Sequence, residues 1–307
     1  MLETIILGTG GTIPLKNRWL ASCLMRSGGN DILIDCGEGT QIAIKSAGYS
    51  MSSIDILCLT HCHADHISGL PGLLLTMGNE SRTKPLTIIG PLGIKAAITG
   101  LLAIAPIVFE LDIHEISMEE LESWQTPFTV GNMQIFPFPV DHDFPCAGYR
   151  VEIPRNGKFN PVKAKENNVP LPLWSKLQKN QHVELNGVLY TQDMILDAPR
   201  KGIKVVYATD SRPVERISEE AKNADLLICE GMYGDPAKYP RVIEAHHMLF
   251  SEAATLAQTA QVKRLLLTHF SPGLDNPEEY VQYAQEIFPN ASCAVDGMKE
   301  VIVFEKD

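Results

Sequence analysis

Short apolar runs with the length of β-strands alternate with longer amphipathic stretches through most of the chain. Residues 4–7, 31–35 and 54–59 are such runs, and each is bounded by glycine, serine or charged residues. Runs of roughly four to eight apolar residues between turn signals are typical of buried strands. Helices of about ten residues separate the strands, the clearest of them over residues 93–105. This alternation predicts an α/β protein.

Two segments depart from the alternation. Residues 108–140 consist of short strand-like runs and turns, and they predict a mostly antiparallel half-sheet that ends at Asp141. Residues 154–199 mix prolines, asparagines and lysines with few apolar residues, so we expect this stretch to bury little and to form an inserted, protruding arm. The chain as a whole, residues 1–307, is therefore expected to be a single domain that carries this arm.

The alternation resumes after the arm. Residues 203–208, 226–229 and 264–267 predict strands, and residues 250–261 predict a helix. The rest of the chain is expected to hold a short acidic helix over residues 277–287 and a last strand over residues 301–304.

Composition narrows the class of protein. Of the 307 residues, 45% are hydrophobic and 21% charged, which is ordinary for a globular protein. No apolar run approaches the roughly 18 residues of a membrane span, and no signal peptide is visible. Seven scattered cysteines predict reduced thiols in a cytoplasmic protein. The net charge of −11 argues against a general nucleic-acid binder, although an enzyme can supply positive potential locally through bound metal and clustered lysines.

A dense cluster of metal-ligand side chains follows the strand at residues 54–59. His61, His63, Asp65 and His66 lie within six positions, and imidazole and carboxylate suit zinc, manganese or iron(II). A surface loop that happens to be rich in histidine is the alternative. Cys62 should point away from its neighbours in an extended loop, so we do not expect it to be a ligand.

Three further candidate ligands follow predicted strands elsewhere in the chain. They are His142, Asp210 and His269. Each alone is more often a hydrogen-bonded structural residue or a turn residue. Together with the cluster they supply seven ligands at strand ends, where sites in α/β proteins collect. Seven ligands suffice for two metals that activate water and clamp a phosphoryl or carbonyl oxygen.

These motifs resemble the metallo-β-lactamase superfamily, whose His-x-His-x-Asp-His signature residues 61–66 match in full. Within it, the chain is similar to the ribonuclease Z family, the endonucleases that process the 3′ end of transfer RNA. That closer similarity rests on motifs that span most of the chain: Pro14-x-Lys16-x-Arg18, Asp35-Cys36-Gly37-Glu38-Gly39-Thr40-Gln41, Gly69-Leu70-Pro71-Gly72-Leu73, Tyr207-x-x-Asp210-x-Arg212-Pro213, His247 with Glu252-Ala253-Ala254, and Thr268-His269-Phe270-Ser271.

The resemblance implies a role for each residue. One zinc ion would be held by His61, His63 and His142, and the other by Asp65, His66 and His269, with Asp210 bridging the two. Manganese or iron(II) could replace zinc. As catalytic residues, Asp65 would orient the attacking hydroxide and His247 would protonate the leaving 3′ oxygen. Lys16 and Arg18 would contact RNA phosphates, whereas His114 and His246 match no motif and are expected to be structural.

The resemblance also implies a fold and partners. The fold would be a four-layer αβ/βα sandwich with two metal ions per subunit, and the protein would be a homodimer that binds precursor transfer RNA through the arm. The arm has Leu171-Pro172-Leu173-Trp174 where the family has a Gly-Pro pair, and Met248 replaces the usual serine or threonine after His247. These departures concern the choice of substrate more than the chemistry.

Three hypotheses follow. The first is a zinc-dependent endoribonuclease that cleaves precursor transfer RNA 3′ to the acceptor stem and leaves a 3′-hydroxyl. The alternative is a metal-dependent hydrolase of small phosphodiesters, sulfate esters or lactones on the same fold, which the acidic net charge and the altered arm favour. The third is a catalytically silent scaffold or RNA-binding paralogue, which the complete set of ligand residues disfavours.

Overall fold

The computed structural model describes residues 1–104, 106–179 and 182–306, which form two compact units. Unit 1 comprises residues 1–152 and 203–303, and unit 2 comprises residues 153–202 with the C-terminal residues from 304. Among the described residues, no helix is both long and apolar enough to cross a membrane. Two seven-stranded sheets make up the centre of unit 1.

Sheet 1 has the order β16-β1-β2-β3-β4-β5-β6. Its strands β3 to β6 are parallel, whereas β16, β1 and β2 run antiparallel to their neighbours. The strands are β1 (Leu2–Gly8), β2 (Ser22–Ser27), β3 (Asn30–Ile34), β4 (Ile54–Cys58), β5 (Leu86–Pro91), β6 (Leu111–Ile116) and β16 (Met298–Ile302). The last strand begins earlier than expected because Met298 already pairs with Ile6 of β1.

Sheet 2 has the order β15-β14-β13-β12-β9-β8-β7, with β12 to β15 parallel and β7 to β9 antiparallel. The strands are β7 (Phe128–Val130), β8 (Met133–Pro139), β9 (Ala147–Arg155), β12 (Arg200–Ala208), β13 (Leu226–Glu230), β14 (Leu265–Thr268) and β15 (Ala291–Cys293). The prediction of one antiparallel half-sheet over residues 108–140 is wrong at its start. Residues 111–116 pair in parallel with β5 in sheet 1, a partner that the local pattern does not encode.

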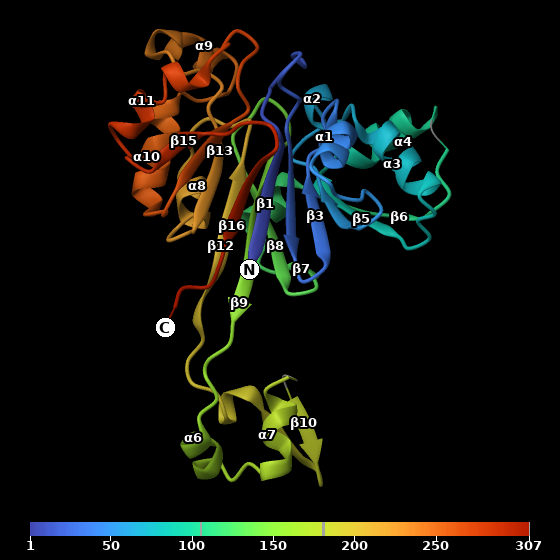
Figure 1. Ribbon diagram of the computed structural model, residues 1–307, viewed down its shortest axis with the longest axis vertical. Helices are drawn as coiled ribbons and strands as arrows, with labels where there is room; N and C mark the ends of the chain where they lie inside the picture. The colour runs from blue at the N-terminus through green and yellow to red at the C-terminus, as the bar shows by residue number, and fades with distance from the viewer. Residues whose placement is uncertain (105, 180–181, 307) are drawn as a thin grey trace. The chain divides into compact units, whose positions relative to one another are not determined.

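Helices cover the outer face of each sheet (Figure 1). Sheet 1 packs against α1 (Thr40–Ser46), α3 (Leu70–Asn79) and α4 (Ile94–Leu102) through one apolar cluster. Sheet 2 packs against α8 (Glu215–Glu220), α10 (Phe250–Ala260) and α11 (Gln282–Gln285) through another. The remaining helices of unit 1 are α2 (Ala64–Ile67), α5 (Met118–Glu122), η2 (Pro236–Lys238), α9 (Tyr239–Glu244) and η3 (Pro277–Glu279).

Side chains on the inner faces join the two sheets. Tyr149 of β9 is fully buried, and its hydroxyl donates to the carbonyl of Leu59 at 2.6 Å, at the end of β4 in the other sheet. The backbone N–H of Ala147 donates to the carbonyl of Thr60 at 2.9 Å. The four-layer αβ/βα sandwich expected from the sequence is therefore confirmed.

Two expected helices differ in extent. The helix predicted over residues 93–105 ends at Leu102, and Ala105 lies outside the described residues. The helix predicted over residues 277–287 is interrupted, because η3 ends at Glu279 and α11 begins only at Gln282.

Unit 2 has a small core of its own. It contains α6 (Pro161–Glu166), α7 (Leu171–Leu177), the hairpin of β10 (His182–Leu185) with β11 (Val188–Thr191), and η1 (Gln192–Met194). The expectation that this stretch buries little is wrong, because six of its apolar residues are buried together: Ala164, Val169, Leu173, Leu177, Ile195 and Leu196. Only three of them lie on helices, α6 and α7, and the others lie between α6 and α7 or directly after η1, so no element shows a long apolar pattern.

Candidate metal centre

The seven side chains predicted as ligands converge at one edge of the two sheets. Four of them lie in the segment after β4, and the others directly follow β8, β12 and β14. Two groups match the two predicted sets: His61, His63 and His142, and Asp65, His66 and His269. Within each group, the potential ligand atoms all lie within 4.8 Å of one another. Asp210 belongs to further groups of this kind, with His61 and His66 and with His247 and His269.

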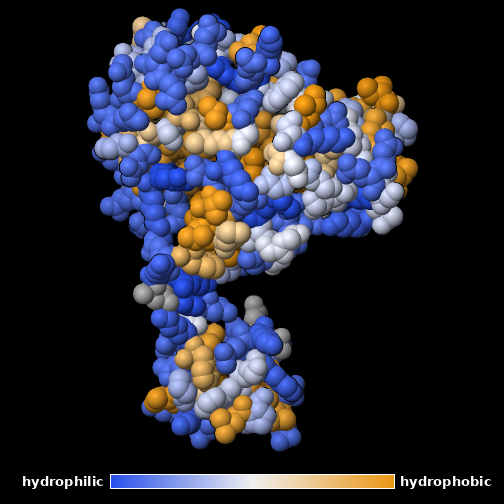
Figure 2. Space-filling view, viewed as in Figure 1, coloured by the Kyte–Doolittle hydropathy of each residue, from blue (hydrophilic) through white to orange (hydrophobic). Residues whose placement is uncertain are grey.

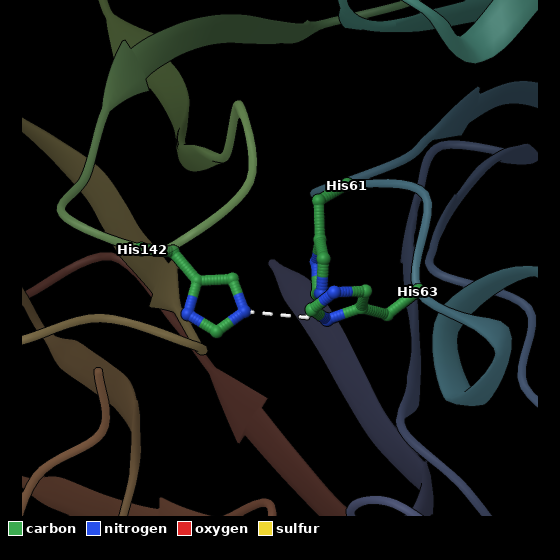
Figure 3. Close-up of side chains that lie close together, drawn as sticks. All are labelled: His61, His63 and His142. Atoms are coloured by element: carbon green, nitrogen blue, oxygen red, sulfur yellow. Dashed lines mark hydrogen bonds between the residues drawn. The ribbon is translucent and has the colours of Figure 1, made fainter. Parts of the chain in front are cut away.

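The first group joins the two sheets (Figure 3). His61 and His63 come from the segment after β4, and His142 faces them from the loop after β8, with its Nε2 3.3 Å from Nδ1 of His63. Burial, with the neighbouring His66, lowers the pKa of His61 well below its ordinary value, and burial lowers that of His142. Both imidazoles are therefore neutral at pH 7, as metal ligation requires.

The second group is more deeply buried. His66 Nε2 lies 3.1 Å from His269 Nε2, and Asp65 Oδ2 lies 3.6 Å from the former and 3.4 Å from the latter. Asp210 reaches both groups. Its Oδ2 is 3.1 Å from His66 Nε2, while its Oδ1 is 3.9 Å from His61 Nε2. This carboxylate therefore lies between the two groups.

Left-handed backbone conformations mark the strand ends at the centre. Asp35 after β3, Asp210 after β12 and His269 after β14 have φ of 60°, 55° and 56°. Residues other than glycine seldom adopt this region, and such strain concentrates at functional sites. The chain turns sharply at these points and places one polar side chain at the end of each strand.

Asp35 contacts the candidate ligand His66 on the side that faces away from the other candidate ligands. Its buried carboxylate accepts hydrogen bonds from the N–H of Thr60 at 2.8 Å and from the Thr60 hydroxyl at 3.0 Å, and it lies 2.8 Å from His66 Nδ1. With Nδ1 held by Asp35, Nε2 is the atom that faces the centre. Burial alone would lower the pKa of His66, but Asp210 and Asp35 raise it well above its ordinary value in the metal-free chain.

The glycine-rich turn after β1 closes one side of the centre. A Cβ at Gly11 would lie 2.7 Å from the His269 ring, so only glycine fits there. The next residue, Thr12, donates its N–H to Asp65 Oδ2 at 2.6 Å. The turn thus orients Asp65, a ligand candidate 53 residues away in sequence.

His247 lies beside the ligands and pairs with a buried carboxylate. Its Nδ1 is 3.1 Å from Oε2 of Glu230, the last residue of β13, and its ring lies 5.6 Å from that of His269. Burial would lower the pKa of His247, but Glu230 and Asp210 raise it to about 9. Glu230 also accepts from the N–H groups of Ser211 at 2.6 Å and Met248 at 3.1 Å.

A divalent cation fits this set of side chains. Among the described residues, buried His61 Nε2 has no hydrogen-bond partner although it faces Asp210. A buried polar atom without a partner is costly unless an ion or water satisfies it. Histidine nitrogens and carboxylate oxygens in this number suit zinc, manganese or iron(II). Cys62 is not in any of the ligand groups and packs half-buried against the core.

The two residues expected to contact RNA have different surroundings. Lys16 is exposed. Arg18 is half-buried, and its guanidinium donates to the carbonyls of Leu274 at 2.9 Å and Asp275 at 3.0 Å. These bonds fix the segment that follows His269, a structural role that the sequence did not indicate.

The remaining histidines lie outside the ligand groups. His114 on β6 pairs with Asp112 at 2.9 Å. The carbonyl of His246 lies 3.3 Å from Nδ1 of His142.

Sequence reasoning missed Glu230 and gave Asp35 no role. The signals available were an acidic residue at the end of an apolar run for Glu230 and the Asp35-to-Gln41 motif for Asp35.

Comparisons with known proteins find relatives over the whole length of the chain. Two family models match parts of the chain: one described as anti-Pycsar protein Apyc1 over residues 2–98 and one described as beta-lactamase superfamily domain over residues 169–270. Relatives named ribonuclease Z from Lachnoclostridium phytofermentans and Agathobacter rectalis are each 50% identical, with 100% of both chains covered. The structure of human tRNase Z, short form, has a TM-score of 0.71 at 24% identity and covers 98% of this chain and 100% of its own, which shows the fold.

Proposed function

Because the chain belongs to the ribonuclease Z family, whose members are metal-dependent endoribonucleases of the metallo-β-lactamase fold, we propose that it cleaves precursor transfer RNA 3′ to the acceptor stem and leaves a 3′-hydroxyl on the mature RNA. One observation carries this proposal. Seven side chains that could bind metal converge beside a histidine whose Nδ1 lies 3.1 Å from a buried glutamate carboxylate.

The proposal includes two zinc ions, which manganese or iron(II) could replace. His61, His63 and His142 would hold one ion, Asp65, His66 and His269 the other, and the carboxylate of Asp210 would contact both. When bound, such ions polarise a phosphoryl oxygen and neutralise the charge that develops on it.

Two side chains would move protons. The carboxylate of Asp65 is ionised, because His269 and His66 outweigh its burial and bring its pKa well below the usual range. It can therefore accept a hydrogen bond from the attacking water and orient it. On the other side, Glu230 contacts Nδ1 of His247, which leaves Nε2 to donate a proton to the leaving 3′ oxygen.

The acidic chain must still attract an anionic RNA. Exposed Lys16 and the lysines of unit 2 would contact phosphates, whereas Arg18 would act mainly by holding the segment after His269. From the family relation we also propose that the protein is cytoplasmic and forms a homodimer. Light scattering at working concentrations tests the oligomeric state directly.

A pair of substrates tests the function. The purified protein is loaded with zinc or manganese and given a precursor transfer RNA on a gel and bis(p-nitrophenyl) phosphate in a plate assay. A single cut at the 3′ side of the acceptor stem with a 3′-hydroxyl product supports the proposal. Cleavage of the chromogenic ester without RNA cleavage at any metal loading would instead favour a hydrolase of small phosphodiesters. A protein without near-stoichiometric metal and without either activity would favour an RNA-binding paralogue.

A further inference from the structure

A cavity of about 270 Å³ lies beside the metal centre in unit 1 and has no role in the chemistry described above. It lies between the segment after β13, the short helices η2 and α9, and the loop after His269. Its walls include two phenol rings, two cations, a hydroxyl and an apolar side chain: Tyr233, Tyr280, Lys238, Arg241, Ser271 and Leu274.

Backbone hydrogen bonds tie the cavity to the catalytic residues. Ser271 lies two residues after His269, and its N–H donates to the carbonyl of Met232 at 3.0 Å. The carbonyl of Tyr233, three residues after Glu230, accepts from the N–H of Phe250 at 3.2 Å. The cavity wall is thus a direct continuation of strands β13 and β14, whose ends carry Glu230 and His269.

The cavity has the chemistry of a nucleotide site. Arg241 Nε donates to the hydroxyl of Tyr233 at 3.1 Å, which holds the guanidinium beside the edge of the phenol that carries its oxygen. Within the described part of the chain, Lys238 and Arg241 form no ion pair, and both are exposed. Asp235 also faces the cavity, but its Oδ1 accepts from the N–H of Ala237 at 2.9 Å. Glu244, outside the lining, interacts electrostatically with Arg241, but within the lining two cations face only one carboxylate, which is already engaged.

The size of the cavity sets what it can hold. Drug-sized ligands occupy pockets of about 300–1,000 Å³, so this smaller cavity suits one ring system and not a base pair. Bases of unpaired RNA commonly stack on tyrosine, with cations on the adjoining phosphate. The face over α9 and α11 is largely hydrophilic (Figure 2), which favours a polar, charged ligand over a lipid or an apolar peptide.

We propose that this cavity binds the base of one unpaired nucleotide next to the scissile phosphodiester, while Lys238 and Arg241 hold its phosphate. The inference rests on the proposed function and adds to it a place where the enzyme reads the RNA on one side of the cut. The nucleotide is either the last one of the mature RNA or the first one of the trailer, since both are unpaired and adjoin the bond that is cut.

Abasic substrates test the proposal and separate the two positions. Wild-type protein and the variant Tyr233→Ala are compared on an intact precursor transfer RNA, on one abasic at the last mature nucleotide, and on one abasic at the first trailer nucleotide. We expect Tyr233→Ala to raise KM for the intact precursor about 5- to 100-fold, the range found when a base-stacking aromatic is removed. One of the two abasic substitutions should raise the KM of the wild type by a similar factor and leave the KM of the variant unchanged.

Charge variants and controls complete the design. The double variant Lys238→Ala with Arg241→Ala should raise KM for the precursor and weaken its salt dependence. The matched double variant Lys45→Ala with Lys95→Ala removes two exposed charges from α1 and α4. It should change neither KM for the precursor nor the salt dependence of KM. Thermal midpoints and metal content report whether each variant is folded.

Three outcomes overturn the proposal. The first is a KM of folded Tyr233→Ala within twofold of the wild type. The second is an abasic penalty that is the same in variant and wild type at both positions. The third is an equal effect of the two double variants. These results leave the proposed function intact as long as the wild type cuts the intact precursor. Failure of the wild type to cut it refutes the proposed function itself.

Discussion

Replacing Glu230 by glutamine tests the proton donor most directly. The carboxylate is fully buried, contacts Nδ1 of His247 at 3.1 Å, and accepts from the N–H groups of Ser211 and Met248. Glutamine keeps the shape and removes the charge. Its single carbonyl can serve only part of these donors, so we expect a loss of roughly 1–3 kcal/mol in the free energy of unfolding.

The larger effect is on His247. Its pKa is about 9 in the metal-free chain, against an ordinary value of 6.5. That difference corresponds to roughly 3 kcal/mol. Because the pKa is raised on folding, the interaction stabilises the protein fully below pH 6.5 and its contribution is lost as the pH rises through about 9. In Glu230→Gln the pKa should fall to 6.5 or below, so at pH 8.5 the protonated fraction of His247 falls on the order of 10²-fold.

The assay is the pH dependence of kcat/KM for precursor cleavage from pH 5.5 to 9.5. Cations bound nearby would lower the pKa of His247 in both proteins alike. The difference between the two pH profiles is therefore the quantity to compare. We expect the limb of Glu230→Gln to lie about 2 pH units lower and the activity to recover toward pH 6, which a misfolded variant would not do. Identical alkaline limbs at equal metal content would refute this role of Glu230.

Further variants extend the test. His247→Ala should lose about 10²–10⁴-fold in turnover at every pH while keeping its metals; loss of metal would make His247 a ligand, as its closeness to other ligand atoms allows. Asp35→Asn should weaken metal affinity about 10- to 100-fold in a chelator titration, and unchanged affinity would mean that His66 needs no support from Asp35. Tyr149→Phe removes a buried bond between the sheets and should lower the urea-unfolding free energy by about 1–3 kcal/mol; an unchanged midpoint would contradict that cost. Lys176→Ala with Lys179→Ala should raise KM for precursor transfer RNA but not for bis(p-nitrophenyl) phosphate, and an equal effect on both substrates would rule out a role in RNA binding.

The candidate ligands were predictable because their signals are local. His61, His63, Asp65 and His66 fall within six positions, and His142, Asp210 and His269 each follow an apolar run. The matching motifs then assigned these residues to a shared site. Because β4 lies in the parallel part of sheet 1 and β12 and β14 lie in the parallel part of sheet 2, most of these strand ends reach one edge of their sheet.

Glu230 was harder to predict because its role depends on tertiary pairing. It lies 17 residues before His247, and the two meet only because β13 lies between β12 and β14 in the middle of sheet 2. The apolar run before Glu230 indicates a buried strand, but nothing in the surrounding sequence says which side chain this glutamate contacts. The core of unit 2 was missed for a similar reason, since its apolar residues are spread over several short elements.

The left-handed backbone at Asp35, Asp210 and His269 bears on the stability of this protein as well as on its candidate metal centre. Such conformations cost on the order of 1–3 kcal/mol each outside glycine, so the fold gives up stability at these strand ends. A metal ion that binds only the folded side chains would return stability, and the gain would grow with the logarithm of the free metal concentration. A cell short of that metal would then hold fewer folded copies of the protein as well as fewer active ones, and the thermal midpoint of the protein would report free metal.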